Sequence, residues 1–306
     1  MPAIDRRQFV RQALRSALAV TAMGGVPVLD LWAATAKPEA LPAVAVRRGE
    51  DIPDLVRRTV AALGGMSAFV KPGETVVVKP NIGWDRTVEL AANTHPLVVR
   101  TVVELCLEAG AKKVRVFDRS ANDPRRCYVE SGIQQAVEEI GSERAVIEHM
   151  DRRAYRDLDI KRGVELTRWS FYGPALDADR LINLPIAKHH SMSILTLGMK
   201  NLMGVIGGNR GTLHREIAES LTDINTVIPS TLTLIDATRI LVANGPQGGR
   251  LEDVRVRNTL IASPDIIAAD SAAASLFDRR PDEIPTIVAG ARRGLGVMDL
   301  TRVRMV

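Results

Sequence analysis

Cysteine is scarce in this sequence, which excludes one common class of redox site. The chain has 306 residues and two cysteines, Cys106 and Cys127, which stand far apart. A cysteine-ligated iron–sulfur cluster needs several thiolates, commonly in closely spaced pairs. We therefore expect no such cluster. Cys106 falls on the apolar face of a predicted helix, so it is expected in the core.

Aromatic residues are also few, at 4% of the chain, although hydrophobic residues reach 46%. Val, Ile, Leu and Ala must therefore fill most of the core. Such a composition favours helices packed on a mostly parallel sheet over a β-sandwich. The predicted fold class is α/β, with a mostly parallel sheet flanked by helices.

Two further absences restrict the partners. The uncharged stretch 16–29 contains Gly24, Gly25 and Pro27 and is only modestly hydrophobic, which makes it a poor membrane span. We expect no stable membrane span in the mature chain. The formal net charge is only +5, and no basic stripe with interleaved aromatic residues is present. Nucleic acid is therefore not an expected partner.

The N-terminus has the pattern of an export signal. Arg6 and Arg7 precede a hydrophobic residue, an uncharged stretch follows, and residues 34–36 supply a small-x-small cleavage pattern. We expect residues 1–36 to be a twin-arginine signal peptide, recognised by the twin-arginine translocase, and the mature protein to be periplasmic or otherwise exported. The alternative is an amphipathic helix retained on a cytosolic protein.

The rest of the chain, 37–306, alternates short apolar runs with helical patterns. The predicted strands and helices of the first half are 43–46, 51–63, 75–78, 94–109, 113–117 and 126–140. Those of the second half are 180–184, 213–228, 231–235, 254–261 and 264–277. This alternation indicates a parallel sheet with right-handed crossovers. Residues 43–150 and 177–295 could form two α/β lobes or one continuous sheet.

Polar residues follow the predicted strands where those strands end. Lys79 and Asn81 follow one strand, Asp118 follows the next, and Asp236 follows a strand of the second half. Ligands of open α/β sheets bind beyond the carboxyl ends of the strands, so these residues are candidate catalytic groups. The alternative is that each of them ends a strand or caps a helix.

Three of the five histidines lie in one short segment. His189 and His190 are adjacent, so on a strand they point to opposite faces, and His214 follows. Together with a carboxylate they are candidate ligands of a divalent transition metal, although their spacing matches no defined zinc motif. Lys188 and Lys200, which would repel a cation, favour an anionic ligand instead.

A glycine-rich segment before a predicted helix is a candidate anion site. Helix N-termini bind anions through free N–H groups. No Walker or dinucleotide fingerprint is present. The alternative is a surface loop. The candidate ligand-binding residues are Gly207, Gly208, Arg210 and Gly211.

The order of these motifs resembles the domain-of-unknown-function family 362, from about residue 43 to 290. The resemblance rests on residues 78–82, 93–96, 116–120, 183–190, 198–204, 214, 235–237 and 245–246. It implies a bacterial or archaeal α/β protein, and many members carry an attached iron–sulfur module that this chain lacks. It implies no particular reaction.

Three hypotheses for function follow. The first is an exported enzyme that acts on a small anionic substrate, with or without a metal. The second is a non-catalytic binding protein for a small anion, and the third is an accessory factor for another exported enzyme. The candidate catalytic residues of the first hypothesis are Lys79, Asn81, Asp118, Lys188, Lys200, Asn201 and Asp236.

Overall fold

The computed structural model describes residues 41–306, and the predicted signal peptide lies outside them. The α-helices are α2 (Ile52–Ala61), α3 (Pro96–Glu108), α4 (Pro124–Glu130), α5 (Ile133–Glu138), α6 (Gly173–Leu176), α7 (Gly198–Asn201), α8 (Ile217–Val227), α9 (Ile266–Ala274) and α10 (Pro285–Arg292). The strands are β1 (Ala43–Arg48), β2 (Thr75–Pro80), β3 (Lys113–Val116), β4 (Ala145–Ile147), β5 (Tyr155–Asp159), β6 (Arg168–Tyr172), β7 (Arg180–Leu184), β8 (Ile186–His190), β9 (Ile194–Thr196), β10 (Leu232–Leu241), β11 (Val254–Ser263) and β12 (Arg304–Met305).

A ten-stranded mixed sheet forms the centre of the described region. Its main order is β12-β1-β11-β10-β7-β2-β3-β4, and β8 and β9 extend from β10. The pairs from β10 through β7, β2 and β3 to β4 are all parallel, whereas β11 is antiparallel to β1 and to β10. The predicted α/β class with a mostly parallel sheet is thus confirmed.

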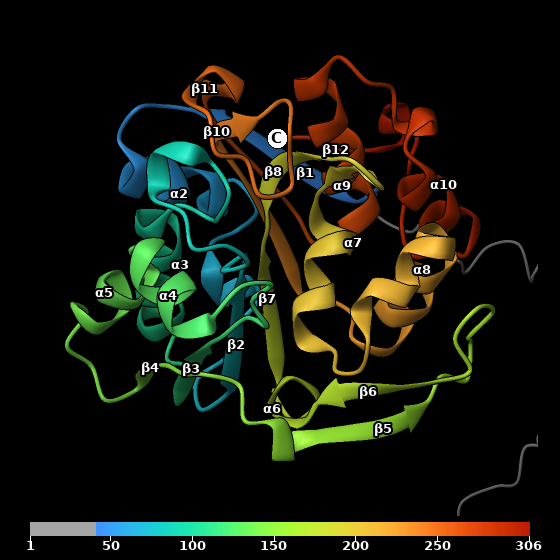
Figure 1. The fold of residues 1–306 in the computed structure, drawn as a ribbon. Coiled ribbons are helices and arrows are strands. Elements are labelled where there is room, and N and C mark those ends of the chain that lie inside the picture. The colour runs from blue at the N-terminus through green and yellow to red at the C-terminus, as the bar shows by residue number, and fades with distance from the viewer. Residues whose placement is uncertain (1–40) are drawn as a thin grey trace, which may run out of the picture. The chain divides into compact units, whose positions relative to one another are not determined.

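Helices cover both faces of this sheet, as Figure 1 shows, with α2 to α5 on one side and α7 to α10 on the other. Successive side chains of β2 alternate between the two faces of the sheet, so one short apolar run contributes to the core on both faces. Val76 and Val78 pack in the core beneath α2 and α3, whereas Val77 packs in the core on the opposite face. Successive side chains of a strand point to opposite faces, so a strand buried on both sides is apolar throughout.

Local signals fix most helix starts. Asp51 caps α2 by accepting a hydrogen bond from Asp54 N, and Pro96 occupies the first turn of α3. The predicted helix 126–140 is instead two helices, α4 and α5. They are separated by Gly132, whose φ of +71° is left-handed. Cys106 is fully buried in α3, as expected.

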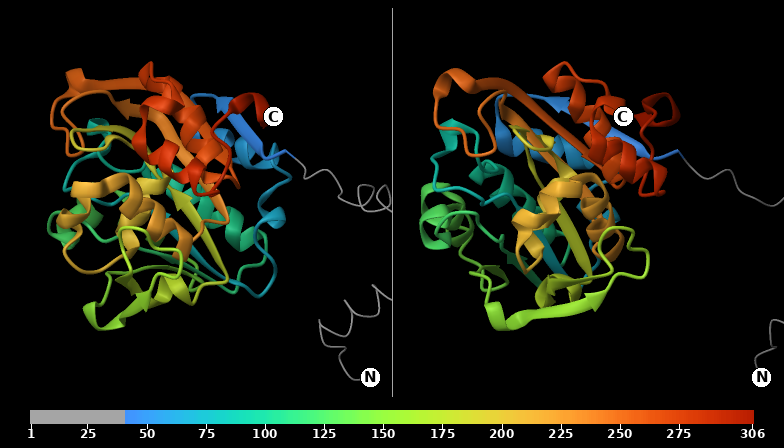
Figure 2. Two further views of the ribbon diagram at one scale, coloured as in Figure 1. Left: turned by 90° about the vertical axis from the view of Figure 1, so that its right-hand side faces the viewer. Right: turned by 45° about the vertical axis from the view of Figure 1, so that its right-hand side comes forward.

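Strands from both predicted lobes join the same sheet. β2, from the first half, pairs with β7 from the second, and their register aligns Lys79 with Asn183. Residues 41–306 form one compact unit. The segment between the halves contributes a separate two-stranded hairpin, β5–β6, which lies at the bottom of both views in Figure 2.

No helix in residues 41–306 is long and apolar enough to cross a membrane. Cys106 and Cys127 are both buried and both free thiols.

Candidate functional site

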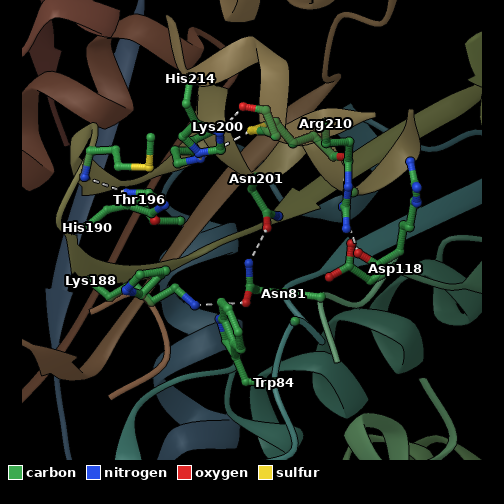
Figure 3. Close-up of a pocket in the computed structure, with 18 of the residues that line it drawn as sticks. Asn81, Trp84, Asp118, Lys188, His190, Thr196, Lys200, Asn201, Arg210 and His214 are labelled. Atoms are coloured by element: carbon green, nitrogen blue, oxygen red, sulfur yellow. Dashed lines mark hydrogen bonds between the residues drawn. The ribbon is translucent and has the colours of Figure 1, made fainter. Parts of the chain in front are cut away.

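The central pocket lies at the carboxyl ends of β2 and β3 and has a volume of about 340 Å³. Figure 3 shows side chains from several elements pointing into it. Its polar and charged lining residues are Lys79, Asn81, Asp118, Arg119, Lys188, His190, Ser191, Thr196, Lys200, Asn201, Arg210 and His214. The remaining lining residues include Trp84, Met192, Met203 and Pro246.

A buried ion pair forms part of the pocket wall. Lys79 Nζ lies 2.8 Å from Asp118 Oδ1, and both side chains are at most 3% exposed. Lys79 Nζ also donates to Pro80 O and to Asn201 Oδ1, whereas Asp118 Oδ2 accepts from Ile82 N. Burial lowers the pKa of Lys79, and the charge of Asp118 opposes this effect. With these partners Lys79 is held in place rather than directed toward a ligand.

Three asparagines connect this ion pair to the next strand. Asn201 donates to Lys79 O and to Asn183 Oδ1, and its own Oδ1 accepts from Lys79 and Asn81. Asn183 in turn donates to Gly198 O, at the start of α7. The amides therefore fix the position of α7, the short helix that carries Lys200, relative to the strand ends.

Lys188, on β8, is buried among neutral oxygen atoms. Its Nζ donates to Asn81 Oδ1 at 3.1 Å and to Ala92 O at 2.5 Å. Burial, together with the charges of Lys200 and Lys79, lowers the pKa of Lys188 to about 7, and Asp118 opposes the shift. Near neutral pH this lysine can therefore gain or lose a proton.

Lys200 has fewer polar partners than the other two lysines. Its Nζ contacts Met203 Sδ at 3.2 Å and His214 Nε2 at 3.3 Å. Within residues 41–306 it forms no ion pair with a carboxylate. Burial, and after it the charge of Arg210, lowers the pKa of Lys200 to about 7.

Hydrogen bonds determine which nitrogen of each pocket histidine carries the proton. His214 Nδ1 lies 3.3 Å from Gly211 O, a carbonyl that can only accept, so Nε2 presents a lone pair to Lys200. His190 Nδ1 accepts from Met192 N and Ser193 N, which leaves a proton on its Nε2. The two rings stack with centroids 5.5 Å apart. Burial lowers the pKa of both, so both are neutral.

The three predicted metal ligands are not brought together. His189 and His190 point to opposite faces of β8, and His189 Nδ1 accepts from Gly245 N instead of facing the pocket. Among residues 41–306 no group of three His, Cys, Asp or Glu side chains could hold a metal ion. The basic side chains that line the pocket, such as Lys188, Lys200 and Arg210, would also repel a metal cation.

Asp236 does not line the central pocket, because β10 continues to Leu241 instead of ending at residue 235. Its Oδ1 accepts from the backbone and hydroxyl of Thr238, and its Oδ2 accepts from His95 N and faces Arg239. With all these partners Asp236 anchors the start of α3. Its predicted catalytic role finds no support in this position.

The glycine-rich segment is docked rather than open. Gly207 N donates to Ser170 O of β6, and Trp169 Nε1 donates to Gly207 O. A 3-10 helix (Arg210–Glu216) precedes α8, and the Asn209 side chain already accepts from Gly211 N at its start. The expected free helix N-terminus is therefore absent from this segment, and only Arg210 and Gly211 of the four residues line the central pocket.

Arg210 and Arg119 hold this segment against the loop after β3. Arg210 donates to Arg119 O, Met203 O and Ser120 O, and Arg119 donates to Ile206 O and Gly208 O. A second pocket of about 730 Å³, which includes Gly207 and Gly208, adjoins the central pocket. The two share Asp118, Arg119, Ala121 and Arg210.

Sequence reasoning missed Trp84 and Arg119 as pocket residues. Trp84 is placed by Asn93, whose side chain accepts from Trp84 N and donates to Trp84 O. The signal for Arg119 was its position directly after Asp118 at a strand end. No local sequence pattern marks Trp84 as a pocket residue, because Asn93, which holds its backbone, lies nine residues further along the chain.

Comparisons with known proteins agree with the motif order. Residues 76–275 match the family described as Domain of unknown function (DUF362). The thylakoid-associated protein sll1697 of Synechocystis sp. is 31% identical over 248 residues, which cover 78% of this chain and 74% of that protein.

Two solved structures have a similar arrangement at low sequence identity. The lactate racemase apoprotein of Thermoanaerobacterium thermosaccharolyticum has a TM-score of 0.47 at 10% identity, over 74% of this chain and 55% of that one. A protein of Thermotoga maritima has a TM-score of 0.42 at 13% identity, over 76% and 60%. The chain thus spans less than two thirds of either solved structure.

Proposed function

The chain belongs to the DUF362 family, and we propose that this member is an enzyme that binds a small anionic substrate and transfers a proton in the central pocket. The observation that carries the proposal is the pair Lys188 and Lys200. Both line one pocket, both are at most 8% exposed, and neither forms an ion pair with a carboxylate in residues 41–306. Buried cations without counter-ions are stabilised by an anionic ligand.

The proton-transfer part rests on the environment of Lys200. A lysine whose pKa lies near 7 can act as a general acid or base at neutral pH. His214 Nε2 lies 3.3 Å from Lys200 Nζ, where it can accept a proton from the lysine, and Gly211 O orients the neutral ring. Lys79 and Asn201 hold the surrounding backbone, so their part in the proposal is to position Lys200 rather than to react.

Calorimetric titration with small anions tests the binding part. Inorganic phosphate, acetate and pyruvate are suitable probes, each titrated near pH 7 in two buffers with different ionisation heats. Anion binding should take up protons, because a bound negative charge raises the pKa of both lysines. Affinity should fall as pH rises above about 7, since the amines lose charge, and it should fall with added salt.

The matched variants are Lys200→Met in the pocket and Lys161→Met on the surface. Lys200→Met should lose most of the affinity and of the proton uptake, whereas Lys161→Met should bind like the wild type, because Lys161 is exposed and outside the pocket. If none of the three anions binds to the wild type at low salt, the proposal is wrong.

The binding-protein hypothesis also predicts that the pocket binds an anion, but it predicts no proton transfer. Hydrogen exchange on a bound ligand distinguishes a binding protein from an enzyme. An enzyme should catalyse uptake of deuterium from D2O into the methyl group of bound acetate or pyruvate, detected by proton NMR. A binding protein should bind the anion without exchange. Lysines whose pKa values are shifted toward 7 inside a closed pocket are typical of catalytic sites, which favours the enzyme.

Export and metal assistance stay separate proposals. The motif around Arg6 and Arg7 supports export by the twin-arginine route, and cell fractionation of an Arg6→Lys, Arg7→Lys variant tests it. Metal assistance would use His190 and His214, which share the pocket. Elemental analysis of the wild type and of His214→Ala tests whether a metal is bound and lost.

A further inference from the structure

We propose that Lys200 is a nucleophile that forms an imine with the carbonyl carbon of a small oxo carboxylate. The inference rests on the proposed function, because it uses the same pocket, and it names the substrate class. An imine-forming lysine must present a neutral amine to a pocket that also holds the rest of the substrate. Four features of the central pocket meet this requirement.

The first feature is the set of contacts at each lysine. Lys79 has three oxygen partners, one of them the Asp118 carboxylate, and Lys188 has two. These oxygens accept hydrogen bonds from the ammonium groups of Lys79 and Lys188 and so favour the charged form of both. Among the residues that the structure describes, Lys200 has only a thioether and an imidazole nitrogen within hydrogen-bond distance. Of the three lysines, Lys200 therefore gives up the least favourable hydrogen bonding when it becomes a neutral amine.

The second feature is the charge around Lys200. It is 8% exposed, and Arg210 is the charged neighbour that disfavours its ammonium form. Desolvation and a neighbouring cation are the two means by which proteins activate a lysine as a nucleophile. A substantial fraction of Lys200 is thus neutral near pH 7.

The third feature is a proton acceptor beside the amine. His214 Nε2 lies 3.3 Å from Lys200 Nζ with its lone pair directed to it. When the amine attacks the carbonyl carbon, the C–N bond forms and the carbonyl electron pair moves to oxygen. His214 accepts one proton from nitrogen and returns it to that oxygen, which gives a carbinolamine. It then carries the second nitrogen proton to the hydroxyl group. The C–O bond then breaks and water leaves, so the net change is amine plus ketone to imine plus water.

The fourth feature is a place for the carboxylate. Lys188 Nζ and the protonated Nε2 of His190 line the same pocket, and in the described part of the chain Lys188 has two acceptors for its three protons. A bound carboxylate keeps Lys188 charged while Lys200 supplies the amine. A pocket of about 340 Å³, which Trp84 and Met203 also line, has room for a small oxo carboxylate.

Reductive trapping tests the inference. The full chain is incubated with pyruvate, 2-oxoglutarate or acetoacetate and sodium cyanoborohydride near neutral pH, and the product is digested for peptide mass mapping. Borohydride reduces an imine to a stable secondary amine. We expect an adduct on Lys200 with at least one of the three acids, and more adduct near pH 7 than near pH 6, because the neutral amine is the reacting form.

Two variants sharpen the result. Lys200→Arg should lose the adduct and keep its charge, and Lys112→Arg, at an exposed position, should react like the wild type. Because the site is mapped in the wild type as well, misfolding of the Lys200 variant does not obscure the answer. Absence of any adduct on Lys200, or equal labelling of exposed lysines, would overturn the inference.

The outcome also separates this inference from the proposed function. If pyruvate or phosphate binds with proton uptake but no acid labels Lys200, the nucleophile is wrong and the anion site stands. If no anion binds and no adduct forms, both are wrong.

Discussion

Three buried lysines differ in chemistry because their neighbours differ. Lys79 pairs with Asp118, Lys188 donates to neutral oxygens, and Lys200 meets a thioether and an imidazole. Burial disfavours the charge of all three, and within residues 41–306 only Lys79 has a carboxylate that offsets this cost directly. The unpaired lysines therefore reduce the stability of the unliganded fold, as reactive groups in closed sites commonly do.

Lys200→Met should raise the stability of the unliganded protein. Met has a similar shape and no charge, so the free energy of unfolding near pH 6.5 should increase by about 1 to 3 kcal/mol. The folded-state pKa of about 7 lies below the usual 10.5, so the unfolded chain holds more protons between these values. Wild-type stability should therefore rise relative to the variant as pH increases from about 7 to 10.

Urea unfolding at about pH 6.5 and 9.5 measures this difference. The advantage of Lys200→Met should be largest at the lower pH and shrink at the higher one. The exposed control Lys161→Met should show no such trend. A destabilised Lys200→Met protein at both pH values would contradict the prediction.

The backbone of the 3-10 helix Leu202–Val205 packs closely against the buried ion pair of the pocket. Gly204 O accepts a hydrogen bond from Arg119 N, so this turn lies directly on the Lys79–Asp118 pair. A Cβ atom at position 204 would lie 1.7 Å from Asp118 Oδ1 and 2.5 Å from Lys79 Nζ. Only glycine allows this close approach.

Gly204→Ala should separate the buried ion pair. We expect a loss of about 3 to 5 kcal/mol of stability, as for a broken buried pair, measured by thermal or urea unfolding. Gly211→Ala is the matched control and should change stability by less than about 1 kcal/mol, because among residues 41–306 its Cβ would meet only Asn209 Oδ1, at 3.2 Å. Equal effects of the two substitutions would show that the close approach is unimportant.

A buried carboxylate outside the pocket anchors α7. Asp270 of α9 accepts from Gly198 N and Met199 N, which are the first residues of the short helix that ends with Lys200 and Asn201. Burial raises the pKa of Asp270 to about 7, although these two N–H groups favour the ionised form. Tertiary contacts therefore hold a helix that is too short to be stable by itself.

One sheet joins the two halves of the described region. β7 lies between β2 and β10, and it is parallel to both. Without the second half, β2 would be an edge strand with unpaired backbone groups. The hairpin β5–β6 is also connected to the centre, through the bridge between Phe171 and Ile206.

We expect residues 41–306 to unfold in one cooperative transition. Trp84 lies in the loop after β2 and Trp169 in β6, so they report on two separate regions. With Trp32 replaced by Phe, the fluorescence of Trp84→Phe and of Trp169→Phe proteins should follow the same urea curve, and far-UV circular dichroism should follow it too. Two separated transitions would indicate that the halves, or the hairpin, fold independently.

The sequence alone determined the α/β class and the existence of strands β1, β2, β3, β7, β10 and β11 and of most of the helices between them. Periodicity and capping act over a few residues, so they can be recognised without a fold. The prediction that Lys79 and Asp118 converge also needed only the rule for parallel strand ends, and their 2.8 Å contact agrees with it.

Only the tertiary structure decided which side chains meet. Asp236 sits within a strand that continues to Leu241, and His189 is turned away from His190 and His214. Gly207 is held by Ser170 and Trp169 of a hairpin that local pattern did not place. Partners such as these depend on sheet register, on the face to which a residue points and on how distant segments dock. A one-residue shift in register would exchange them, and no short stretch of sequence specifies that choice.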